Sequence, residues 1–201
     1  MIFRRLFLIL SVLICFLSSC FDDLDNKEYF NFYNSFEEAS YIEIVKGDFI
    51  YQLQYRPPEF LALNSLKSNK TISDSELSDE IDKYNQGLNF CLRIKSIRDE
   101  DALEANTASR AEYYQRIGQL TSEFQNSIIG VNKTDTIRCQ FHLYEPSYKI
   151  HPFVQVLFSL NGSKEELPSE IVHLDNIFNK NELIRFNNFI NYQESLPDLD
   201  I

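Results

Sequence analysis

Tryptophan is absent from this 201-residue chain, and glycine, histidine and methionine are scarce, with five, three and one copies. Phosphate-binding loops need closely spaced glycines, and neither such a loop nor a Gly-x-Ser-x-Gly nucleophile turn occurs here. The three histidines, His142, His151 and His173, lack the spacing of zinc ligands. The sequence therefore predicts no metal, no cofactor and no catalytic residue from a known motif.

Positive charge is also in short supply. The chain carries 19 Lys and Arg against 30 Asp and Glu, for a net charge of −11. Such a chain repels phosphate backbones, so nucleic acid is not an expected partner. The hydrophobic fraction of 44% is ample for a core and unlike that of a disordered chain.

The N-terminal apolar stretch, residues 6–17, is too short to span a bilayer, which takes about 20 apolar residues as a helix. Two arginines precede it and Leu17-Ser18-Ser19-Cys20 follows, which is the arrangement of a secretory signal. Those last four residues resemble the lipobox of bacterial lipoproteins. The resemblance implies that residues 1–19 form a cleaved signal peptide. It also implies that Cys20 carries acyl chains such as palmitate and holds the protein on a membrane.

Acidic residues follow the cysteine in Phe21-Asp22-Asp23-Leu24-Asp25. This stretch resembles the acidic export tag of Bacteroidetes outer-membrane and surface lipoproteins, and an ordinary acidic linker is the alternative. The resemblance implies a place in the bacterial cell envelope, at the outer membrane, on the periplasmic side or the cell surface. We expect an acidic tether over residues 20–40 and one domain over residues 41–201.

The domain is predicted to be α+β, with an antiparallel sheet and two main helices. Ser73–Gly87 and Ser109–Ile129 both open with a capping box and carry an apolar stripe, and Phe124 belongs to the second stripe. A Pro-Pro pair begins a short helix that extends to Leu66. Alternating patterns predict strands over residues 41–45, 49–55, 88–97, 136–144 and 153–160. Residues 171–178 and 182–192 fit strands slightly better than helices.

Cys91 and Cys139 would remain after signal cleavage, in an exported setting that permits a disulfide. Cys139 alternates with Phe141 and Leu143 on the expected apolar face of its strand, and Cys91 lies on a polar face. This pattern favours separate thiols over a bridge, and both alternatives stay open.

Arg93, Lys95 and Arg138 lie on the polar faces of two predicted strands, together with His142. If the strands are neighbours, these side chains form a basic stripe that could bind an acidic protein segment or an anionic glycan. Cross-strand pairing with local acids is the alternative. The sequence favours a lipid-anchored binding or assembly module at the outer membrane. The alternative is a small envelope hydrolase acting on peptide or glycan.

Overall fold

The computed structural model describes residues 24–66, 72–133, 135–163 and 167–200. The predicted signal peptide and Cys20 lie outside the described residues. The strands of the described part are β1 (Ile42–Lys46), β2 (Phe49–Tyr55), β3 (Leu88–Ser96), β4 (Ile128–Val131), β5 (Thr136–Glu145), β6 (Phe153–Leu160), β7 (Glu170–Asp175) and β8 (Glu182–Phe186).

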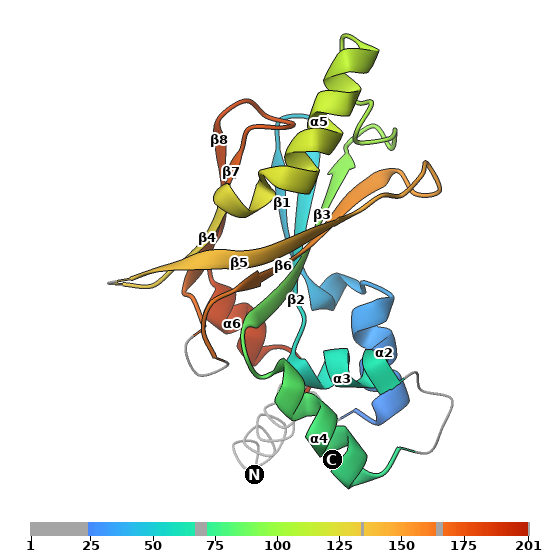
Figure 1. The fold of residues 1–201 in the computed structure, drawn as a ribbon, viewed down its shortest axis with the longest axis vertical. Coiled ribbons are helices and arrows are strands. Elements are labelled where there is room, and N and C mark those ends of the chain that lie inside the picture. Colours follow the sequence, from blue (N-terminus) through green and yellow to red (C-terminus); the bar gives the residue numbers. More distant parts are fainter. Residues whose placement is uncertain (1–23, 67–71, 134, 164–166, 201) are drawn as a thin grey trace, which may run out of the picture.

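These eight strands form one antiparallel sheet in the order β1-β2-β3-β6-β5-β4-β7-β8 (Figure 1). The two edge strands approach each other at one end. There Lys46 of β1 forms a 3.1 Å ion pair with Glu182 of β8, and the Asn179 side-chain amide donates to the Lys46 carbonyl oxygen. The sheet is therefore a nearly closed barrel.

The described helices are α2 (Asn26–Asn34), α3 (Pro58–Leu66), α4 (Asp74–Tyr84), α5 (Arg110–Ser122) and α6 (Phe189–Glu194). The α+β prediction is confirmed, but two main helices do not dominate the fold, which is rich in β-structure. α5 has 13 residues and α4 has 11, whereas α2 and α3 have nine each. No helix among the described residues is long and apolar enough to cross a membrane.

Both predicted helix starts carry a serine N-cap, but in neither case does the glutamate complete the box, since Glu112 accepts from the Ala108 N–H and Glu76 from the Ser73 hydroxyl. The Ser73 and Ser109 hydroxyls each accept a 3.3 Å hydrogen bond from the backbone N–H three residues later, at the first turns of α4 and α5. The second helix ends at Ser122, earlier than Ile129, because residues 128–131 form β4 between β5 and β7. Tertiary pairing overrides the helical period there.

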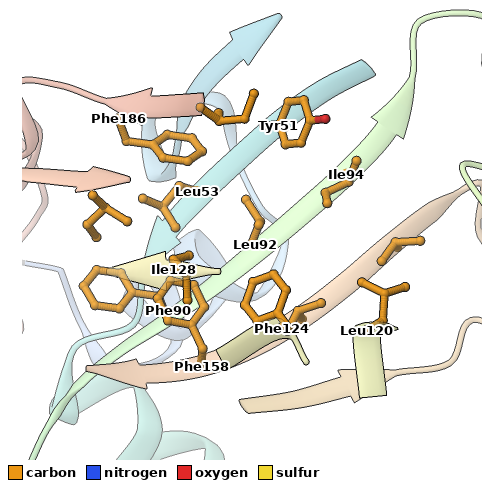
Figure 2. Close-up of a cluster of buried hydrophobic side chains, with 14 of the residues drawn as sticks. Tyr51, Leu53, Phe90, Leu92, Ile94, Leu120, Phe124, Ile128, Phe158 and Phe186 are labelled. Carbon is orange, nitrogen blue, oxygen red and sulfur yellow. The ribbon is translucent and has the colours of Figure 1, made fainter. Parts of the chain in front are cut away.

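The barrel interior holds the main hydrophobic core (Figure 2). Along β6, Val154, Val156, Phe158 and Leu160 are buried and alternate with half-buried residues. Phe124 is 1% exposed and packs into this core, as the helical stripe predicts. The core residues labelled in Figure 2 lie on β2, β3, β4, β6 and β8, on α5 and at Phe124, directly after α5.

A second hydrophobic cluster joins α2, α3 and α4, which lie together at one end of the molecule (Figure 1). Tyr29 and Tyr33 of α2 are buried, and Phe60 of α3 lies 5.3 Å from Tyr33 between ring centroids. The structure thus differs from the predicted tether over residues 24–40, which are folded against the domain. Their aromatic side chains pack against the domain and stabilise a helix that the weak periodicity of this segment does not predict.

The two ambiguous C-terminal segments have different structures. Residues 170–175 form strand β7, as favoured. Residues 182–186 form β8, after which the chain turns at Asn188 and forms the helix α6. The second segment is therefore half strand and half helix.

Candidate functional site

A serine, a histidine and an aspartate meet inside the barrel. His173 and Asp175 are both buried on β7, and the His173 Nδ1 lies 3.3 Å from the hydroxyl of Ser127. Ser127 is half-buried and lines a small cavity of about 220 Å³ beside α5. This trio is the arrangement that most resembles a hydrolytic site, so its geometry decides whether the hydrolase alternative has support.

The hydrogen bonds of this trio do not match a Ser-His-Asp relay. The Ser127 hydroxyl donates to the Phe124 carbonyl oxygen at 2.7 Å, and His173 Nδ1 lies 3.3 Å from both the hydroxyl and the carbonyl oxygen of Ser127. A catalytic histidine must instead accept the serine proton. The Nε2 atom of His173 is buried without a partner, and burial lowers the pKa of this histidine.

Asp175 has a structural role at the β7–β8 turn. Its carboxylate accepts from the Tyr51 hydroxyl and from the backbone N–H groups of Ile177, Phe178 and Asn179, the last three at 2.9, 2.9 and 2.7 Å. Burial and the adjacent carboxylate both raise the pKa of Tyr51. Four donors saturate this carboxylate, which leaves His173 without the orienting partner of a triad.

The other histidines do not complete a site in the described part of the chain. His142 lies within 3.0 Å of the Thr121 carbonyl oxygen, and its ring and that of His173 both pack on Phe124. No group of three His, Cys, Asp or Glu side chains among the described residues could hold a metal ion.

Both described cysteines are free thiols. Cys91 points to the outer face of β3 yet is fully buried under the helical end, and burial raises its pKa to about 11. Cys139 pairs with Leu160 and packs against the barrel core. The bridge that the sequence left open is absent, and the protonated Cys91 is a poor nucleophile.

The predicted basic stripe does not form, because its two strands are not neighbours. β6 lies between β3 and β5 in the sheet. Arg93 and Lys95 share the outer face of β3, opposite Gln155 and Phe153 of β6. Arg138 lies near the start of β5, opposite Ile129 of β4. Arg93 and Lys95 are thus brought together, and Arg138 is not part of their surface.

A β-bulge in β5 reverses the faces that its sequence pattern predicts. The pairing with β6 shifts between Cys139 and Phe141, so one extra residue is inserted. Beyond the bulge, His142 and Tyr144 face the core, whereas Phe141 and Leu143 face outward. A bulge shifts every later side chain to the other face, which single-strand alternation cannot anticipate.

The bulge leaves large apolar side chains in solvent. Phe141 is 59% exposed and Leu143 is 48% exposed, and Leu157 beside Leu143 on β6 is half-buried. We call Phe141, Leu143 and Leu157 the outer patch. Contiguous apolar surface of this kind marks an interaction site more often than an inert surface.

The connection between β5 and β6 extends this surface and projects from the barrel (Figure 1). Tyr148 and Ile150 are 82% and 75% exposed at its tip. Tyr148 and Lys149 have positive φ angles of 48° and 63°, a conformation that costs free energy for residues other than glycine. Strained backbone that displays apolar side chains is a frequent feature of recognition loops.

Comparison with known proteins gives no family for this chain. No family model and no curated protein matches it. A crystal structure of a protein of unknown function from Burkholderia pseudomallei K96243 matches with 12% identity and a TM-score of 0.37. The match covers 90% of this chain and 98% of that one. At this level of similarity no property of that protein transfers to this chain.

Proposed function

We propose that this chain is a lipid-anchored protein of the bacterial outer membrane whose domain binds a protein partner through the outer patch. The observation that carries the binding role is the exposure of Phe141 and Leu143 beyond the bulge, at 59% and 48%. Protein interfaces place aromatic and aliphatic side chains at their centres. The aliphatic Leu143 and Leu157 of the outer patch therefore favour a protein over a glycan, which binds by stacking on aromatic rings and by hydrogen bonds.

The net charge of the chain favours a different protein over a second copy of this one. At −11, two copies repel each other before they meet. Residues 33–40 of this chain contact the outer face of β2 and β3 at Gln54 and Arg93. A partner surface of similar apolar character would complete the cover.

The lipid anchor rests on the lipobox resemblance at Cys20 and on its distance from the folded domain. Leu24 already contacts the domain, through backbone hydrogen bonds with Asp198 and Asp200. Four residues span at most about 14 Å, so acyl chains on Cys20 would hold the domain close to the membrane surface. The outer patch would then face partners in or beside the same membrane.

The anchor is tested by Cys20→Ala, followed by membrane fractionation and mass spectrometry of the mature N-terminus. We expect the acylated wild-type protein in the membrane fraction and an uncleaved or soluble variant. Wild-type protein with no acyl mass on Cys20 contradicts the anchor and leaves the binding surface to be judged separately.

The binding surface is tested by photo-crosslinking in intact cells from a benzophenone amino acid at position 143, with position 183 as the matched control. Leu143 and Leu183 are both 48% exposed, and they lie on β5 and β8. We expect one discrete adduct from position 143 that disappears with Phe141→Ser, and no such adduct from position 183. Equal patterns at both positions contradict the proposal, and an adduct of twice the chain mass identifies a second copy instead.

A further inference from the structure

Arg93 is a half-buried cation that forms no direct ion pair in the described part of the chain, and the charge of Glu145 acts on it only from a distance and through Gln155. No Asp or Glu oxygen among the described residues lies within 4.0 Å of its guanidinium. The buried Arg116 in contrast has direct partners at its Nη groups, and only its Nε lacks one among the described residues. Its Nη1 donates to three backbone carbonyl oxygens, and Glu112 lies 3.8 Å away. Buried charges are normally paired, so Arg93 lacks a partner that Arg116 has.

The guanidinium of Arg93 is held in place on three sides. Its Nε donates to the Gln155 side-chain oxygen at 2.7 Å, and the Gln155 amide donates to Glu145. The guanidinium lies 3.7 Å from the centroid of the Phe36 ring and 4.6 Å from that of Phe153. The Nη groups are thus the part of this side chain left to bind a ligand.

A hollow of about 280 Å³ opens beside this guanidinium. Its walls come from β3, β6 and the β5–β6 connection, and they consist of Arg93, Glu145, Pro146, Ser147, His151, Phe153 and Gln155. The His151 ring stacks on Phe153 at 5.0 Å and 9°, which closes one side. The hollow is large enough for one side chain, and its geometry is fixed before any ligand arrives.

We propose that this hollow receives the carboxylate of an acidic side chain from the protein partner, bound by the two Nη groups of Arg93. This inference rests on the proposed function and names the partner's chemistry. The planar fork of a guanidinium matches two carboxylate oxygens, and a preordered arginine loses little entropy in binding them. A carboxylate would also give Arg93 the direct ion pair that it lacks among the described residues, against the repulsion of Glu145 in the same wall.

The surroundings of the hollow indicate a peptide rather than an anionic glycan. Leu157 is the diagonal neighbour of Arg93 on the same outer face, and Leu143 is one strand further. Strand and residue spacings place Arg93 and Leu143 about 12 Å apart. The partner segment should therefore carry an acidic and an apolar side chain at about that separation. The net negative charge of the chain opposes an acidic segment as it opposes a second copy, so the segment must be held by its short-range pairing with Arg93.

The test is selection of displayed random dodecapeptides on the full chain in detergent micelles, with counter-selection on Arg93→Gln. We expect enriched peptides to share an Asp or Glu with nearby apolar residues. Fluorescence anisotropy should show that Arg93→Gln, or Glu→Gln in the peptide, weakens binding about 10- to 100-fold, as for loss of a charge-assisted pair. Lys95→Gln, on the same strand face, is the control and should change affinity much less.

The peptide substitution keeps the test valid if Arg93→Gln unfolds, because it leaves the protein intact. Enriched peptides without an acidic residue, or with affinity unchanged by Glu→Gln, contradict the inference. Arg93-dependent binding of a sulfated oligosaccharide, with no acidic peptide enriched, also overturns it. If acidic peptides bind but Leu143→Ser and Phe141→Ser have no effect, the carboxylate site stands and the outer patch fails. If peptides need the patch but not Arg93, the outer patch stands and the carboxylate site fails.

Discussion

The outer face of the sheet has a covered half over β2 and β3 and a bare half over β5 and β6. One cross-strand row, Gln54–Cys91–Leu157–Leu143, crosses both halves. Gln54 and Cys91 are fully buried, whereas Leu143 is 48% exposed. The polar Gln54 is thus buried and the apolar Leu143 is exposed, which is the reverse of what transfer free energies favour. The covered half is closed by the chain itself, and the bare half is the surface that we propose for partner binding.

The covered half is closed by specific contacts from the N-terminal segment. The Gln54 side-chain amide donates to the Tyr33 carbonyl oxygen at 3.0 Å and to the Ser40 hydroxyl at 2.9 Å. The Phe36 ring covers Arg93. These contacts end at β3, so the boundary between the two halves lies close to Arg93. The proposed carboxylate site therefore lies where the chain's own cover stops.

The largest loss of stability should come from removing a buried aromatic side chain of the N-terminal segment that covers β2 and β3. Tyr33 is 1% exposed among Tyr29, Phe32 and Phe60. Tyr33→Ala should lower the free energy of unfolding by about 3–5 kcal/mol, as for other buried aromatic truncations. Chemical denaturation of the full chain in detergent measures this. A change below about 1 kcal/mol would mean that the helical end packs loosely on the sheet.

A buried histidine in the barrel interior should make the free energy of unfolding depend on pH, and neither half of the outer face contributes to this dependence. Burial lowers the pKa of His173 in the folded chain. At a pH below the ordinary histidine pKa of about 6.5, the unfolded chain therefore binds a proton that the folded chain does not. Stability should therefore fall as the pH drops from about 7 to 5, by up to about 1.4 kcal/mol per pH unit from this group. His173→Gln should remove that slope, and His151→Gln, at an exposed position, should keep it. Identical slopes in all three proteins would contradict this role of His173.

A smaller effect is expected where the covered half begins. The Asp25 carboxylate accepts from the backbone N–H groups of Lys27 and Glu28 at 2.9 and 2.8 Å and caps α2. Asp25→Ala should therefore cost about 1 kcal/mol of stability.

In the export-tag hypothesis Asp22 and Asp23 act on localisation, so their replacement should reduce protease accessibility on intact cells. Loss of accessibility only with Asp25→Ala would indicate a folding defect instead of a tag.

The smallest stability effect is expected on the bare half. Leu143→Ser should change the free energy of unfolding by less than about 0.5 kcal/mol, because an exposed side chain loses little on truncation. Phe141→Ser, which shortens the neighbouring exposed side chain, should have a similarly small effect on stability and should remove the adduct formed from position 143. A loss of more than about 2 kcal/mol would show that Leu143 is packed in the free protein, and the two halves would no longer differ.

Local signals in the sequence predict much of the fold. The Ser73 and Ser109 caps, the hairpin around Gly47 and the burial of Phe124 follow from side-chain chemistry within a few residues. The order of the strands does not, because pairing of β3 with β6 depends on contacts between residues about 58 to 72 positions apart. The sequence does not predict the helix α2, because its stability comes from packing on α3 rather than from its own pattern.

The sequence predicts the candidate site in part. Arg93 and Lys95 do share an outer face, since alternation within one strand is local. The pattern groups Arg138 with them because the intervening strand β6 cannot be inferred from the alternation of a single strand. The outer patch escapes prediction because the bulge after Cys139 has no glycine or proline to mark it. A Phe and a Leu that alternate with His and Tyr fit either face of a strand.

The difference between the two halves can be measured directly by the accessibility of single cysteines in intact cells. In a Cys139→Ser background, Leu143→Cys and Leu183→Cys replace two leucines of equal exposure, 48%. A membrane-permeable maleimide should modify both at similar rates in the purified full chain. In cells, the account predicts that position 143 is protected and position 183 is not. Equal labelling of both positions in cells would contradict the claim that a partner covers the bare half.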